Sequence, residues 1–143
     1  MMKQETKNGI FIFLLIGLYF LVIDAMDLAN FPLLKLANIV FIVIGVNLTI
    51  KHLAQQGFTY LTIFARGFAT ALIGIILSLI GLFIYFQFIL GGVDLTEYQT
   101  TLIPAKELSH FFFAMFFEGM AVAAIVPFTL LQYWKKYINE TRN

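Results

Sequence analysis

Hydrophobic residues fall into four long runs along the chain, separated by short polar stretches. The runs cover residues 9–26, 33–50, 68–90 and 109–131. With a rise of about 1.5 Å per residue, each run is long enough to cross a hydrocarbon core about 30 Å thick as a helix. The pattern therefore predicts an all-α membrane protein in which four transmembrane helices form one bundle, a single transmembrane domain over residues 1–143.

The first run begins like a signal peptide, because Lys3, Glu5 and Lys7 precede it. A cleavable signal has roughly 7–15 apolar residues, followed by a site of small residues. This run is longer, and Asp24 and Asp27 stand where such a site would lie. The sequence therefore predicts that the first helix is retained.

The link between the second and third runs, residues 53–67, mixes polar with aromatic side chains. Gln56 and Thr59, for example, flank Phe58. Such mixing is typical of a short amphipathic segment that lies in the membrane interface. An early start of the third helix explains the pattern equally well, and both alternatives stay open on the sequence.

Composition agrees with a membrane location. Hydrophobic residues make up 61% of the chain and charged residues 12%, whereas soluble domains average roughly 45–50% and about 25%. A soluble fold of this composition would have too little polar surface to cover itself. The chain has no cysteine, which excludes disulfides, thiolate nucleophiles and cysteine metal sites. We expect no cofactor and, without a basic patch beyond the helix ends, no nucleic-acid partner.

Basic residues cluster at one end of the predicted bundle. In membrane proteins, Lys and Arg near the ends of the spans concentrate on the cytoplasmic side. An arrangement with both termini cytoplasmic (N-in, C-in) leaves only Lys35 and Lys106 in the outer loops. It places the other seven of the nine basic residues inside: Lys3, Lys7, Lys51, Arg66, Lys135, Lys136 and Arg142.

Small residues form a stripe along the third helix. Their spacings of four, three, four and three place them on one side of the helix. In lipid, helices meet through close packing of small residues rather than through burial of apolar surface. We therefore expect a helix-packing seam, within one chain or between chains, at Gly67, Ala71, Gly74, Ser78 and Gly81.

Glu118 lies about two residues from the centre of the fourth run. An ionisable group at this depth costs at least about 2.5 kcal/mol when charged and rarely faces lipid. Counting from the centre of each run places Tyr19, Asn38 and Ser78 at a similar depth. These four residues form a predicted intramembrane polar site. It is interpreted either as a structural hydrogen-bonded knot, which we favour, or as a proton-binding site.

A second polar cluster is predicted at the outer end, where Asp24 and Asp27 stand three residues apart and His110 begins the fourth helix. The i, i+3 spacing puts both carboxylates on the same side of their helix. If the first and fourth helices are neighbours, Asp24 and His110 can pair. A hard cation requires more oxygen ligands than this cluster supplies, so no metal site is expected.

Three features of the sequence match a known pattern: the stretch from 45 to 51 with the polar link after it, the opening of the third helix, and the final helix with its basic tail. In the last two the matching residues are Phe64, Ala65, Arg66, Gly67, Phe68, Phe117, Glu118 and Gly119. In these features the chain resembles a family of small four-helix bacterial inner-membrane proteins, the domain-of-unknown-function family 4199. The resemblance implies a bacterial inner (cytoplasmic) membrane and supplies no biochemical activity.

The expected function is that of an accessory or structural multi-pass inner-membrane subunit, whose partners are the lipid bilayer and either a larger membrane protein or a second copy. The alternative is a small oligomeric proton-coupled transporter or channel that uses Glu118. Between residues 119 and 131, Thr129 is the one further polar side chain, which counts against a continuous proton path. An enzyme is not expected, because a catalytic site requires several convergent polar groups.

Overall fold

The computed structural model describes residues 3–29, 31–92, 94 and 107–140. In those ranges every regular element is a helix, and there is no strand. The elements are α1 (Gln4–Ala25), α2 (Pro32–Gln55), α3 (Tyr60–Ile84), its short continuation η1 (Tyr85–Ile89), and α4 (Leu108–Glu140). Four of these helices, counting η1 with α3, are long and apolar enough to cross a membrane. The predicted all-helical fold is confirmed.

The helices extend beyond the hydrophobic runs. α1 begins at Gln4, α2 continues to Gln55, and α4 continues to Glu140. The length of an apolar run reflects the thickness of a hydrocarbon layer, whereas backbone hydrogen bonding continues through polar residues that favour helix. Gly57, with a φ of 75°, adopts the left-handed conformation that commonly ends a helix. α3 then starts at Tyr60, so residues 60–67 of the link between the second and third runs are an early start of the third helix, whereas residues 53–55 end α2.

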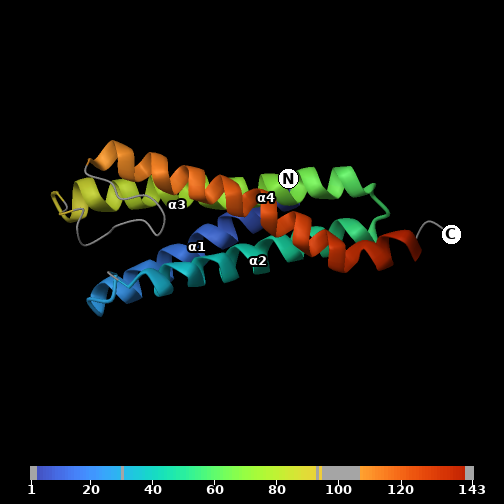
Figure 1. Ribbon diagram of the computed structural model, residues 1–143, viewed down its shortest axis with the longest axis horizontal. Coiled ribbons are helices and arrows are strands. Elements are labelled where there is room, and N and C mark those ends of the chain that lie inside the picture. The colour runs from blue at the N-terminus through green and yellow to red at the C-terminus, as the bar shows by residue number, and fades with distance from the viewer. Residues whose placement is uncertain (1–2, 30, 93, 95–106, 141–143) are drawn as a thin grey trace.

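The four helices form two antiparallel hairpins that cross each other (Figure 1). α1 pairs with α2, α3 pairs with α4, and every helix contacts at least two of the others. The turn between α2 and α3 and the end of α4 lie at one end of the bundle. The connection from α1 to α2 and the start of α4 lie at the opposite end.

Glycines bring α1 and α3 into close contact. A Cβ atom added to Gly74 would lie 2.7 Å from Cγ2 of Ile12 and 3.3 Å from the carbonyl oxygen of Gly9. A Cβ added to Gly9 would lie 2.5 Å from Cγ2 of Ile73. Distances this short do not occur between real side chains, so the two helices can cross here only because both positions are glycine.

The stripe of small residues on α3 packs inside the chain. Ala71 and Gly74 are buried, and a Cβ at Gly67 would lie 3.0 Å from Pro127 of α4. Gly81 stands opposite the ring of Phe13, at 3.0 Å by the same measure. The Ser78 hydroxyl donates to the carbonyl oxygen of Gly74 in its own helix. The structure therefore places these positions against neighbouring helices rather than on an open face.

Aromatic residues form a separate core at the end of the bundle where α4 starts. Phe86 is 1% exposed and packs its ring against Phe20, Phe111 and Phe112. It lies in η1, where the Leu90 N–H donates to the carbonyl of Tyr85, five residues back. Such a π-turn inserts an extra residue into the helix. Tyr85 and Phe86, although adjacent, consequently both contact the other helices.

Candidate functional site

Glu118 of α4 is half-buried, and its carboxylate attracts the ammonium group of Lys35. Lys35 was assigned to an outer loop from the sequence, but it lies in the first turn of α2 because that helix begins at Pro32. Proline is favoured at the first position of a helix, where its missing N–H would have no partner. Glu118 thus has an ionic neighbour on α2 that the sequence analysis placed outside the membrane.

Two of the other predicted partners of Glu118 donate their hydroxyl protons to backbone carbonyls instead. The Tyr19 hydroxyl donates to the carbonyl oxygen of Leu34, at 2.9 Å. The Ser78 hydroxyl donates to the carbonyl oxygen of Gly74, at 2.7 Å. Asn38 has its amide oxygen buried without a hydrogen-bond donor. The charge of Lys35 therefore interacts electrostatically with Glu118, while Tyr19 and Ser78 do not give it their hydroxyl protons.

At the end of the bundle where α4 starts, Asp24 accepts a hydrogen bond from the Tyr85 hydroxyl at 2.6 Å. His110 is exposed and contacts Glu107, with Nδ1 3.9 Å from the carboxylate. Asp27 is also exposed, and its φ of 57° places it in the turn after α1. The structure therefore pairs Asp24 with Tyr85 and does not bring it to His110. The reason is geometric, since the Tyr85 ring extends from η1 onto α1.

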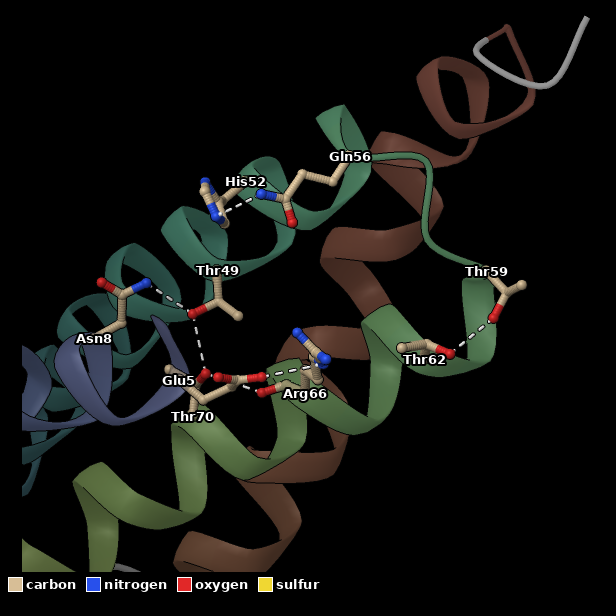
Figure 2. Close-up of polar contacts among 9 residues, drawn as sticks. All are labelled: Glu5, Asn8, Thr49, His52, Gln56, Thr59, Thr62, Arg66 and Thr70. Atoms are coloured by element: carbon tan, nitrogen blue, oxygen red, sulfur yellow. Dashed lines mark hydrogen bonds and ion pairs between the residues drawn. The ribbon is translucent and has the colours of Figure 1, made fainter. Parts of the chain in front are cut away.

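The largest polar cluster in the described residues was not predicted from the sequence (Figure 2). It joins three helices, with Glu5 and Asn8 from α1, Thr49 from α2, and Arg66 and Thr70 from α3. Glu5, Asn8, Thr49 and Thr70 are all buried. We call these five residues the polar cluster.

Hydrogen bonds in the polar cluster run in one direction. The Thr70 hydroxyl donates its only proton to the carbonyl oxygen of Arg66, at 2.9 Å. It can then accept from the Thr49 hydroxyl, whose oxygen lies 3.0 Å away, nearer than the other acceptor of the Thr49 proton, the Gly45 carbonyl oxygen at 3.5 Å. Thr49 in turn accepts from the Asn8 amide, at 2.8 Å. One chain of donors thus connects α1, α2 and α3.

An ion pair closes the cluster on its exposed side. Nε of Arg66 donates to Oε1 of Glu5 at 3.2 Å, and the two side chains are 40% and 10% exposed. The guanidinium also stacks over Phe58, with Cζ 4.8 Å from the ring centroid. The second carboxylate oxygen of Glu5 is buried without a donor. Because Arg66 is partly exposed, the pair contributes at most about 1 kcal/mol by itself.

The sequence did contain a signal for this cluster. Glu5 and Asn8 are three residues apart, and Arg66 and Thr70 are four apart, so each pair shares one face of its helix. Glu5, Asn8 and Arg66 stand just outside the apolar runs, and Thr70 stands near the start of the third run. Helix boundaries drawn at the edges of the apolar runs conceal such pairs.

A fully buried apolar layer lies in the core of the bundle. Each helix contributes one residue with no exposed surface: Ile12 of α1, Val46 of α2, Ala71 of α3 and Ala123 of α4. All four belong to one continuous core. On α2, Val46 lies between Thr49 of the polar cluster and Lys35, whereas each of the other helices carries residues of only one of the two polar regions. The core of the bundle is packed with apolar side chains at these four positions.

Two further bonds attach the last turns of α4 to the bundle. Nε1 of Trp134 donates to the Asn47 side chain of α2 at 2.8 Å, and the Gln132 amide donates to the Tyr60 hydroxyl of α3 at 2.9 Å. Within the ranges that the structure describes, no group of three or more His, Asp and Glu residues could hold a metal ion. The side-chain bonds of Gln132 and Trp134 link α4 to α3 and α2.

Comparison with known proteins gave no match: no family model, no curated protein and no solved structure is similar to this chain. The function is consequently inferred from the geometry of the polar regions and of the apolar layer.

Replacing Thr49 with valine tests the polar cluster. Valine has nearly the same shape but cannot accept from Asn8 or donate to Thr70, so we expect a loss of about 1–2 kcal/mol of unfolding free energy. The matched control is Thr62→Val, because Thr62 bonds Thr59 on the exposed surface. Thermal unfolding of the detergent-purified proteins measures both changes. Equal losses in the two variants would contradict a structural role for the cluster.

Proposed function

We propose that this chain is an accessory or structural multi-pass subunit of a bacterial inner membrane, and that it packs against a larger membrane protein. The observation that carries the proposal is the buried apolar layer of Ile12, Val46, Ala71 and Ala123 in the core of the bundle. A conducting bundle needs polar groups or water along its axis. This bundle is closed by packed side chains, which favours a structural role.

The outward face of α4 offers a surface for the partner. Phe117 and Phe128 are 63% and 55% exposed, and the exposed small residues Ala121 and Ala124 lie between them. Membrane helices approach each other closely where such small residues occur. A helix of the partner would meet α4 at the two alanines and be flanked by the two phenylalanine rings.

Extraction in mild detergent tests the proposal. A tagged chain should retain a larger membrane protein in a fixed ratio, and Ala121→Phe should reduce the retained amount at least fivefold. Leu18→Phe is the matched control, because Leu18 is 63% exposed on α1. Recovery of the chain alone, or only as a homo-oligomer, would defeat the proposal.

The location in a bacterial inner membrane rests on the resemblance to the domain-of-unknown-function family 4199, and the orientation rests on the distribution of Lys and Arg. Reporter fusions test the orientation. Fusions after Gly57, in the turn between α2 and α3, and after Asn143 should report a cytoplasmic location. A fusion at Glu97 should report an external one. An external signal after Asn143 would contradict the arrangement.

The alternative function, a proton-coupled transporter or channel, is favoured by one observation. Glu118 and Lys35 bring an acid and an amine together between two apolar helices, and ionisable groups at such positions frequently mark proton pathways. The apolar layer opposes this alternative, because its buried side chains offer no polar group to carry a proton through the core of the bundle.

A further inference from the structure

A groove lies between α3 and α4 toward the end of the bundle where α4 starts. The two helices run side by side there (Figure 1). Its volume is about 560 Å³. It is lined by Leu79, Ile80 and Phe83 of α3 and by five residues of α4 between Leu108 and Phe116. Seven of the eight lining residues are apolar and the eighth is Ser109. This size and lining are typical of ligand sites, which span roughly 300–1,000 Å³.

The groove follows the axis of α4. Its α4 wall extends over eight residue steps, or roughly 12 Å along the helix axis. An extended hydrocarbon chain can lie along this wall.

The position of the groove also determines the chemistry of its occupant. Both walls belong to helices that are apolar enough to cross a membrane, so the opening of the groove would face the acyl layer of a bilayer. Ile80 and Phe113 on its walls are 51% and 64% exposed within the chain. Ser109, in the first turn of α4, places the one hydroxyl of the lining at the end nearest the bilayer surface.

We propose that this groove binds one acyl chain of a phospholipid, with the ester region of the lipid at Ser109. The hydroxyl can donate to an ester or phosphate oxygen, while the apolar walls contact the chain. The site adjoins the α4 face proposed for the partner, because the Phe116 ring of the groove contacts Phe117, but it does not depend on the partner's existence. The lipid would therefore be retained by the isolated protein as one bound molecule per chain.

Photolabelling tests this site in the purified full chain. The protein is placed in nanodiscs of phosphatidylethanolamine and phosphatidylglycerol that contain a phosphatidylethanolamine with a diazirine on one acyl chain. Mass spectrometry then locates the labelled residues. We expect labels to concentrate on the lining residues of the groove, with a stoichiometry approaching one per chain.

Filling the groove should remove the label. Ile80→Trp places a large side chain in the groove and should lower labelling of the α4 wall at least fivefold. Ile76→Trp is the matched control, because Ile76 is 42% exposed on the same helix but does not line the groove. Ser109→Phe blocks the other end and provides the same test if Ile80→Trp does not fold.

Three results would overturn the proposal. One is equal labelling of the Ile80→Trp and Ile76→Trp proteins. Another is labelling spread evenly over other exposed faces, such as that of Leu18 on α1. The third is displacement of the label by a quinone but not by unlabelled phospholipid, which would assign the groove to a different ligand.

Discussion

Gly74→Leu is expected to disrupt the bundle, whereas Ile76→Leu on the same helix should leave it intact. At Gly74 even a Cβ atom would lie 2.7 Å from Ile12 and 3.3 Å from the backbone oxygen of Gly9. A leucine would have to push α1 and α3 apart, and overpacking of this kind costs about 3 kcal/mol or more where backbone must move. The measurement is thermal unfolding in detergent, followed by fluorescence of Trp134.

The control variant, Ile76→Leu, changes an exposed position near the buried Gly74. Ile76 is 42% exposed, and the exchange of isoleucine for leucine conserves volume, so its expected effect is below about 1 kcal/mol. The two substitutions lie two residues apart at nearly the same depth. Equal tolerance of both would show that Gly74 is not at a helix crossing.

Glu118→Leu is the second change with a large expected effect, because it leaves the Lys35 ammonium without its counter-charge. Removal of one partner of a fully buried ion pair costs about 3–5 kcal/mol. Both residues here are only half-buried, and a lysine can extend its charge toward the membrane surface, so we expect about 1–3 kcal/mol. Unfolding of the purified variant measures the loss.

The pairing of Glu118 with Lys35 predicts a specific rescue. Lys35→Met in the Glu118→Leu background removes the unpaired charge and should recover most of the lost stability, because an apolar pair can replace an ion pair at little cost. A double-mutant cycle gives the coupling energy between the two positions. Additive losses in the double variant would show that Glu118 and Lys35 do not stabilise each other.

The architecture was predictable because long apolar runs and the spacing of small residues are properties of the chain alone. Four runs gave four helices. The positions from Gly67 to Gly81 share one side of α3 wherever its partners lie, and the structure places α1 and α4 against that side. The spacing could not reveal which helices pack against that side of α3.

The polar contacts were largely not predictable, for two physical reasons. Helix ends extend past the apolar runs, so Lys35, Glu5 and Asn8 belong to helices although they stand outside or at the edges of the runs. Polar partners also come from residues distant in sequence, as with Asp24 and Tyr85, 61 residues apart. Such pairs depend on the crossing of the helices, which no single helix encodes.

Proton permeability tests most directly the central claim that this bundle is a sealed structural subunit. The purified chain is reconstituted into liposomes that enclose a pH-sensitive dye, and an inward proton gradient is applied. We expect the dye to respond at the rate of protein-free liposomes, for the native chain and for Glu118→Gln, in which glutamine keeps the size and hydrogen-bonding capacity of the acid but cannot carry a proton. A proton flux that increases with the amount of native protein and disappears in folded Glu118→Gln would contradict the claim.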